Sequence, residues 1–373
     1  MGESRTEGVI AWALMAPALV VLGVFGIFPI FYAFFVSLHR WRIKKGEFLG
    51  SAHYLRALGD PVALVGLLCG LGMVWLGLRW WASHPVASRR WTGRACLLAG
   101  TWLSLHSVLA MADAGDGRLF NAFKVTLFYS MGTIPLEVGG SLLLATLLFK
   151  IARARSFFRV LFFLPYITPM IATAVVFRTI FSPNPSSLAN RFWTLVGSDP
   201  QRWLYDSRSI VALALQGLGI DSYPAWVDTS FPSMSLVCVL LYNIWVYIGY
   251  DTVILLAGLS AIPRHYFEAA AIDGADAWQS FRHVTLPLIS PTLFFISLVA
   301  VIGTFKAFNH IYILRTAGAQ DTVDVVSILI FDQIYQFHNA GYASALALIL
   351  FVTILALTVL QNRLLGRRVF YGD

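Results

Sequence analysis

The sequence predicts an all-α polytopic membrane protein, a helical bundle with about eight transmembrane helices. Hydrophobic residues make up 58% of the 373 residues and charged residues only 12%, and the mean hydropathy is +0.72. A soluble domain carries roughly twice that share of charge. Several apolar stretches also reach the ~20 residues that a helix needs to cross ~30 Å of hydrocarbon. These observations exclude a soluble protein.

The predicted spans follow one another along the chain. They are Val9–Leu38, Val62–Trp81, Ala95–Ala112, Asn121–Phe149, Phe158–Phe181, Pro232–Gly258, Leu286–Phe308 and Gly341–Leu365. The first span follows a single basic residue and is far longer than the apolar core of a signal peptide, so we expect it to be retained.

An even number of spans places both chain ends on one side of the membrane. The short linkers Ser83–Arg94 and Lys150–Arg159 are rich in arginine, which favours the cytoplasm for this side. The basic run from Arg40 to Lys45 then lies outside, against that rule. Because basic residues of membrane proteins gather in loops, the net charge of +8 does not indicate a nucleic-acid partner.

Cysteine and histidine give no sign of a disulfide framework or a metal centre. Cys69, Cys96 and Cys238 all fall inside apolar stretches, where we interpret them as small core residues. The histidines are scattered and form no metal-ligand spacing. We therefore expect no metal site.

Two loops are long for a compact bundle. Ser182–Phe231 is polar and aromatic, and we expect a folded outer cap in which Ile210–Ile220 forms a short helix on the membrane surface. Ser260–Thr285 lies on the opposite side. Within it, Pro263 fits the first turn of a helix, Asp273-Gly274 supplies a chain reversal, and Ala275–His283 forms a second short helix.

The second long loop is therefore a helix–turn–helix finger just outside the membrane. The small residues Ala269, Ala270 and Ala271 at its centre allow another protein surface to approach closely. An ordinary amphipathic loop is the alternative interpretation.

The finger resembles the EAA signature of the inner-membrane components of binding-protein-dependent ABC importers. The matching residues are Glu268, Ala269, Ala270, Asp273, Gly274 and Ala275, followed by Leu286-Pro287. In that family the loop forms the coupling helix that docks into a groove of the cytoplasmic ATPase subunit. The resemblance thus implies a coupling role for Glu268, Ala269, Ala270, Asp273 and Gly274.

The resemblance extends over roughly the last 250 residues. Asn121–Thr126, Arg155–Pro169 and Gly341–Phe351 are similar to core helices of the family, and Ala16–Leu38 is similar to the extra N-terminal helix of carbohydrate-type permeases. We therefore divide the chain into 1–118, an N-terminal helix with an inserted hairpin, and 119–373, a permease core with the coupling loop at 260–285 and the outer loop at 182–231.

The family implies a subunit of the cell (inner) membrane that translocates a sugar or related solute. Its partners would be a second permease forming a heterodimer, two ATPase subunits, an extracytoplasmic solute-binding protein and membrane lipid. The chain contains no Gly-Lys pair and hence no phosphate-binding P-loop. We expect no cofactor in this chain, with ATP and Mg bound by the partner ATPase.

A polar face in the sixth span is the candidate substrate path. Asn243, Tyr247 and Tyr250 recur at i, i+4 and i+7 and share one helical face, with Asp251 beside it. Hydroxyls and an amide on aromatic surfaces suit a sugar. By resemblance to the maltose permease, these three, Val246 and Tyr166 line the sugar site. Polar residues that join helices are the alternative.

The seventh span adds little to this face. Its corresponding positions are Ala300, Thr304 and Ala307, which leaves one hydroxyl, and Lys306 and Asn309 are expected to point elsewhere on the helix. The charges of Glu137, Asp251, Arg178 and Lys306 either contact an ionic solute or, in the interpretation we favour, pair with one another or with the second subunit.

Two other functions stay open. An integral-membrane enzyme acting on a lipid-linked substrate would need convergent carboxylates or a nucleophile and base near one membrane face, and the sequence shows no such cluster. A passive channel would transport without ATP. The prediction is a transport subunit that is not an enzyme.

Overall fold

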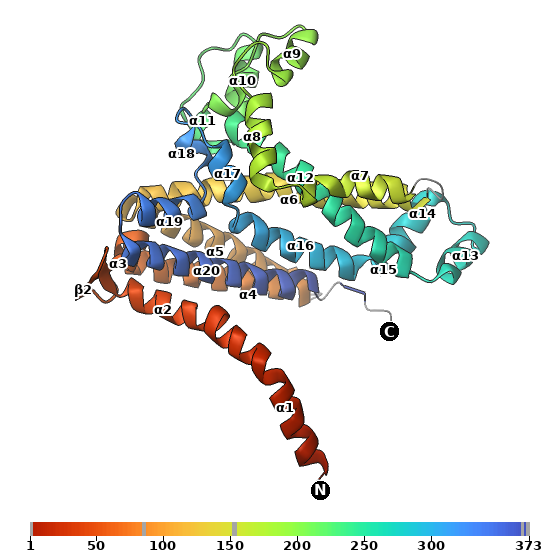
Figure 1. Cartoon of the computed structure of the whole chain (residues 1–373), viewed down its shortest axis with the longest axis horizontal. Helices are drawn as coiled ribbons and strands as arrows, with labels where there is room; N and C mark the ends of the chain where they lie inside the picture. Colours follow the sequence, from red (N-terminus) through yellow and green to blue (C-terminus); the bar gives the residue numbers. More distant parts are fainter. Residues whose placement is uncertain (1–2, 84–86, 151–154, 367–368, 371–373) are drawn as a thin grey trace. The chain divides into compact units, whose positions relative to one another are not determined.

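The computed structural model describes residues 3–83, 87–150, 155–366 and 369–370. The linkers Ser83–Arg94 and Lys150–Arg159 contain residues that lie outside this set. The chain forms two compact units, Met1–Phe120 with Leu329–Phe351, and Asn121–Ile328 with Val352–Asp373. Nearly all elements are helices, coloured along the chain in Figure 1.

The first unit begins with the long N-terminal span. It consists of α1 (Glu3–Val21), a π-helical turn (Leu22–Ile27) and α2 (Phe28–Ser37). The predicted continuous helix is therefore confirmed, with one turn of wider winding. A short antiparallel hairpin of β1 (His39–Trp41) and β2 (Lys45–Phe48) follows, which the sequence analysis did not anticipate.

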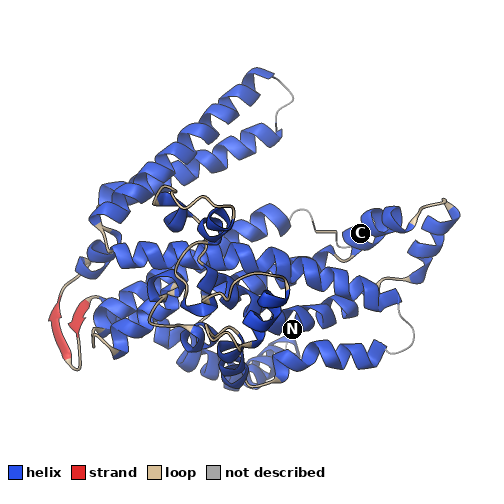
Figure 2. Cartoon of the chain, turned by 90° about the horizontal axis from the view of Figure 1, so that it is seen from above, coloured by secondary structure: helices blue, strands red, loops and turns tan. Residues whose placement is uncertain are grey.

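The predicted inserted hairpin is a tight helix pair. After α3 (Ala52–Leu58), helices α4 (Pro61–Ser83) and α5 (Ala87–Ala114) run side by side (Figure 2). Small residues set their separation, because a Cβ at Gly70 would meet the backbone nitrogen of Ser104 at 2.8 Å. Such contacts hold helices together in a bilayer, where lipid is as apolar as leucine.

Residues far apart in sequence complete the first unit. Helix α19 (Val326–Tyr335) enters it, and α20 (Ala340–Leu365) begins in it. The Tyr342 hydroxyl donates to Asp116 Oδ2 at 2.6 Å, and the Arg56 guanidinium lies over the Tyr342 ring at 4.4 Å. These contacts join the start of α20 to α3 and to the loop before α6.

The second unit contains the helices that surround the candidate site. They are α6 (Gly117–Lys150, whose first turn lies in the first unit), α7 (Arg155–Ile167), α8 (Met170–Ile180), α12 (Met234–Ala261), α16 (Ser290–Phe305), α17 (Asn309–Leu314) and α18 (Gln320–Val323). Half of α12 faces the core, and Tyr242 at its centre is fully buried. The Tyr242 hydroxyl reaches Thr173 Oγ1 at 2.7 Å and the Met170 carbonyl at 2.9 Å, which fixes the start of α8 against α12.

Two predicted spans are not straight. The span predicted at Phe158–Phe181 bends by 91° between α7 and α8, at Thr168-Pro169, and the one at Leu286–Phe308 is bent by 65° near Ile289. Proline lacks the backbone N–H of a helix interior and clashes with the preceding turn, so helices break beside Pro169 and Pro291. Within the described residues, six helices can cross a membrane, or up to eight if each bent pair is one span.

The loop 182–231, predicted as an outer cap, is folded, and its side of the membrane stays a prediction. It contains α9 (Leu188–Leu195), a 3-10 turn (Trp203–Tyr205), α10 (Ile210–Gly217) and α11 (Trp226–Ser230). The fully buried Asn190 accepts from Trp203 Nε1 at 2.7 Å and from the Gln201 backbone at 2.8 Å. The predicted helix at Ile210–Ile220 is present and ends one turn early.

An ion pair stabilises the base of the cap. Asp206 Oδ2 accepts from Arg208 at 2.6 Å and is largely buried. Burial alone would raise the pKa of Asp206, but the hydrogen bonds from Arg208 outweigh it and lower the pKa. The carboxylate therefore stays ionised, while the backbone carbonyls of Asp206 and Arg208 accept from Ser235 and Met234 at the start of α12.

We predict that Gly249→Ala destabilises the second unit. A Cβ at Gly249 would lie within bonding range of the Phe162 carbonyl on α7, so the two helices must separate. Forcing a methyl group into such a contact costs ~1–3 kcal/mol. The thermal midpoint of the purified protein should fall, whereas Gly139→Ala, where a Cβ meets nothing within 4 Å, should leave it unchanged. Equal midpoints for both variants would contradict this packing.

Candidate functional site: a polar cavity and an exposed helical finger

A cavity of about 280 Å³ lies among the helices of the second unit. The predicted substrate-path residues Tyr166, Asn243, Tyr247, Tyr250 and Thr304 all line it, although they come from α7, α12 and α16. The structure thus gathers around one space residues that are up to 138 positions apart, from 166 to 304.

Aromatic rings form one side of the cavity. The rings of Tyr166 and Tyr250 stack with centroids 4.3 Å apart and planes 20° apart, and Tyr247 meets Tyr166 edge-on at 5.7 Å. Phe163 lies beside both rings, with its centroid 5.6 Å from that of Tyr166 and 6.4 Å from that of Tyr250. The i, i+4, i+7 spacing on α12 therefore does present Asn243, Tyr247 and Tyr250 to the same space.

Polar contacts between helices fix the other side. Asn243 Nδ2 donates to Glu137 Oε2 of α6 at 3.0 Å. The hydroxyls of Thr304 and Ser130 are 2.5 Å apart, so the single hydroxyl expected from the seventh span is already engaged. Asp251 also lines the cavity, as does Glu137, and both side chains are buried.

Lys306, Asn309 and Val246 lie elsewhere than the sequence predicted. Lys306 and Asn309 line the cavity instead of pointing elsewhere, because α16 ends at Phe305 and α17 starts anew at Asn309, so a continuous helix is the wrong guide. Val246 is 2% exposed in the hydrophobic core and does not line the cavity. Arg178 also lies apart from the cavity and donates to the Ile313 carbonyl at 3.3 Å.

Two polar residues that line the cavity, Glu137 and His310, were not named as site residues from the sequence. Glu137 lies in the apolar helix α6, and its position inside a span was itself a signal, since acids in a membrane commonly face a cavity. His310, whose Nε2 lies 2.8 Å from the Tyr129 hydroxyl, gave no such signal because it follows the break after α16.

The finger is the second candidate site. It contains α13 (Arg264–Ile272), α14 (Ala277–Ser280), a π-helical turn (Phe281–Thr285) and α15 (Leu286–Leu288) (Figure 1). Pro263 precedes the first helix as its N-cap instead of lying in its first turn. Gly274 has φ +77°, the left-handed conformation that the predicted reversal requires.

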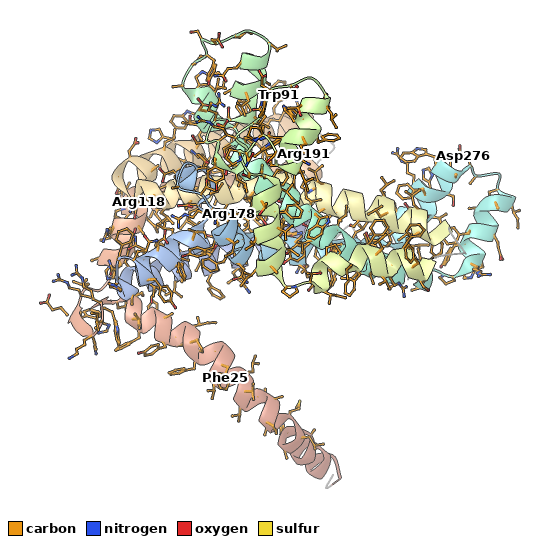
Figure 3. All side chains as sticks on the ribbon, turned by 45° about the horizontal axis from the view of Figure 1, so that its top comes forward. Phe25, Trp91, Arg118, Arg178, Arg191 and Asp276 are labelled. Atoms are coloured by element: carbon orange, nitrogen blue, oxygen red, sulfur yellow. The ribbon has the colours of Figure 1, made fainter. Side chains whose placement is uncertain are left out.

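The finger holds its own shape and leaves its surface open. Asp276, labelled in Figure 3, accepts from the Gln279 backbone at 2.7 Å, and the Gln279 side chain accepts from the Asp276 backbone, which closes a capping box. Phe267 packs on the core beneath. Glu268 is exposed, and Ile272 is 86% exposed. Tyr266 and Trp278 of the finger are exposed as well, and several exposed apolar side chains on one element are typical of a protein-binding surface.

Neither site has the composition of a metal centre. Among the residues that the structure describes, no group of three or more His, Cys, Asp or Glu side chains could hold a metal ion. The cavity is lined by aromatic rings, an amide and carboxyl groups.

Comparisons with known proteins agree with this picture. Residues 138–371 match the family model described as "Binding-protein-dependent transport system inner membrane component". The chain is 30% identical over 265 residues to the probable ABC transporter permease protein YesP of Bacillus subtilis (strain 168), covering 70% of this chain and 77% of that protein. It is 26% identical over 249 residues to the arabinooligosaccharides transport system permease protein AraP of the same organism, covering 66% and 72%.

The fold also has a solved counterpart. The structure resembles a chain in the crystal structure of a bacterial alginate ABC transporter in complex with an alginate pentasaccharide-bound periplasmic protein, with a TM-score of 0.56, 22% identity, and coverage of 78% of this chain and 98% of that chain. Because the family model matches more than half of the chain, including the finger and every cavity residue except Glu137, the protein belongs to the inner-membrane components of binding-protein-dependent transport systems and is a transport subunit, not an enzyme.

Proposed function

We propose that this permease moves a saccharide or related polyhydroxylated solute into the cell. The observation that carries the proposal is the convergence of Tyr166, Tyr250 and Asn243 on one cavity within a transport fold. Stacked tyrosines offer flat faces to a sugar ring, and the amide adds a donor and an acceptor. The AraP relative, whose name specifies arabinooligosaccharides, supports the same solute class.

The size of the cavity supports a small solute. At about 280 Å³ it lies just below the ~300–1,000 Å³ of typical small-molecule sites. A second permease would complete the enclosure. An enzyme acting on a lipid-linked substrate is not supported, because the family is one of transport subunits. A passive channel is separated from our proposal by uptake that depends on ATP.

The proposed assembly is a heterodimer of this chain with a related permease, carried on two ATPase subunits that bind ATP and Mg. An extracytoplasmic binding protein delivers the solute, and both termini lie in the cytoplasm. The presence of one finger per chain supports a second, related membrane half, and the binding protein is supported by the family description and by the complex of the alginate transporter.

Purification tests the assembly. The chain expressed with its operon neighbours should yield a complex that contains two different permeases and the ATPase, as read by mass spectrometry of the intact complex. An active homodimer would contradict the heterodimer.

We further propose that the finger couples transport to ATP hydrolysis through Glu268, Ala269, Ala270, Asp273 and Gly274. Gly274→Pro should leave the protein inserted and the complex able to bind ATP but abolish ATP-driven uptake, because proline cannot adopt a φ of +77°. Glu268→Ala should weaken coupling through loss of an exposed contact.

Gly274→Asn is the matched control for the turn. Asparagine tolerates the left-handed conformation, and a Cβ at Gly274 meets nothing within 4 Å. Uptake should therefore survive in Gly274→Asn. The coupling assignment fails if Gly274→Pro and Glu268→Ala both transport at the normal rate.

The cavity residues are tested by transport rate per complex. Tyr250→Ala or Asn243→Ala removes a contact worth on the order of 1 kcal/mol or more, so affinity at the membrane site should fall about tenfold. The binding protein still makes the first selection, and the loss should appear in the maximal rate. Tyr335→Ala, whose exposed ring lies outside the cavity, should transport normally. A constant rate per assembled complex in the first two variants would assign them a structural role.

A further inference from the structure

Two carboxyl groups occupy the interior of the cavity. Glu137 of α6 and Asp251 of α12 both line it, and each is only 4% exposed. Asn243 Nδ2 donates to Glu137 Oε2 at 3.0 Å, and both carboxyl groups border the same cavity. Asp251 Oδ2 is buried and has no hydrogen-bond partner. One acceptor of the pair is thus left for a group that the chain itself does not provide.

The negative charge of the pair is not balanced nearby. Among the described residues, the ion pairs within 4 Å are Asp206 with Arg208 and Asp324 with Arg315, and neither involves the cavity acids. Lys306 and His310 line the same cavity without pairing with Glu137 or Asp251, and Lys306 is exposed. Burying a carboxylate without a cationic partner costs free energy, so a bound cation that pairs with these acids would offset that cost.

We propose that Glu137 and Asp251 make this cavity selective for a solute that carries a protonated amino group, such as an amino sugar. This inference rests on the proposed function and names the solute class of the same site. An ammonium group has three donors and no acceptor, which suits the free Oδ2 of Asp251 and the neighbouring Glu137 carboxyl group. Charge-assisted hydrogen bonds of this kind are about twice as strong as neutral ones.

The tyrosines favour the same ligand. Ring faces attract cations within ~6 Å, and Tyr166, Tyr247 and Tyr250 border the space beside Asp251. A uronic acid would instead bring its carboxylate toward two acids in a medium of low dielectric, where like charges repel strongly. The acids therefore raise the affinity for amino sugars and lower the affinity for acidic sugars.

The test compares three disaccharides of nearly equal shape on the complete permease–ATPase complex in nanodiscs, without the binding protein. The probes are the β-1,4-linked glucosamine disaccharide, cellobiose and cellobiouronic acid, each at neutral pH. Binding is measured by isothermal titration calorimetry. The amino disaccharide should bind at least about tenfold more tightly than cellobiose, and the uronate more weakly than either.

Isosteric variants assign the effect to the pair. Asp251→Asn and Glu137→Gln should each reduce the ratio of amino-disaccharide affinity to cellobiose affinity toward unity. Glu137→Gln keeps an oxygen that accepts from Asn243, so the helices stay joined if Asp251→Asn fails to assemble. Asp199→Asn is the matched control, because it removes an equal charge from an exposed site in the outer cap.

Each other outcome counts against the inference. Equal binding of cellobiose and the amino disaccharide by the unaltered complex, or an unchanged preference in both variants, would overturn it while leaving the saccharide function intact. Loss of the second permease from the complex in both variants, with the preference retained, would show that the acids pair with that subunit instead. If none of the three probes binds, and the complex takes up no saccharide with ATP, the proposed function itself fails and the inference fails with it.

Discussion

The geometry of the cavity depends on the close crossing of α7 and α12. Gly249 allows this crossing, since any side chain there would strike the Phe162 carbonyl. The same approach brings Tyr166, one turn after Phe162, onto Tyr250, the residue directly after Gly249, with ring centroids 4.3 Å apart. Helices in a bilayer gain little from hydrophobic burial against each other, so contact at small residues decides where they cross. A single glycine thus sets the position of the aromatic wall.

Broken helices provide the space that the crossing borders. Non-helical backbone is tolerated at membrane depth only where protein buries it or water reaches it. The chain meets this condition twice. The bend at Thr168-Pro169 lies between Tyr166 and Met170, which both line the cavity, and the gap after Phe305 delivers Lys306 and Asn309 to it. The first break thus places Tyr166 and Met170 around the cavity, and the second adds the polar groups of Lys306 and Asn309.

The sequence predicted the elements better than their bends. Apolar length identified the spans, and the spacing of Asn243, Tyr247 and Tyr250 identified a shared face, because both depend on local periodicity. The conformation of Gly274 could also be predicted, since a chain reversal that needs a left-handed residue favours glycine. The placement of Lys306 and Asn309 was not, because a helix break is decided by tertiary contacts.

Local sequence pattern was equally unable to predict which residues of different helices come together. Glu137 and Asp251 are 114 positions apart, from 137 to 251, and nothing in either segment shows that α6 and α12 bring them together. The sequence interpretation favoured pairing of the four charges with one another or with the second subunit. The structure brings the two acids to one cavity and places Arg178 on a backbone carbonyl. Such an arrangement is easily missed, because acids are not expected to lie together.

The proposed cavity and the proposed coupling finger share one rigid element. Helix α12 carries Asn243, Tyr250 and Asp251 and ends at Ala261, directly before the finger. At a rise of 1.5 Å per residue, Asp251 lies about 16 Å from Ile262, where the finger begins. Ile262 and Phe267 pack with Leu255 and Leu259 of the same helix, so the base of the finger is clamped to α12. Under the proposed coupling, a displacement of the finger is transmitted along α12 as a rigid-body movement, and the aromatic and acidic groups move with it relative to α6. The Asn243–Glu137 hydrogen bond crosses that boundary, and it is therefore the contact that such a movement must stretch or break.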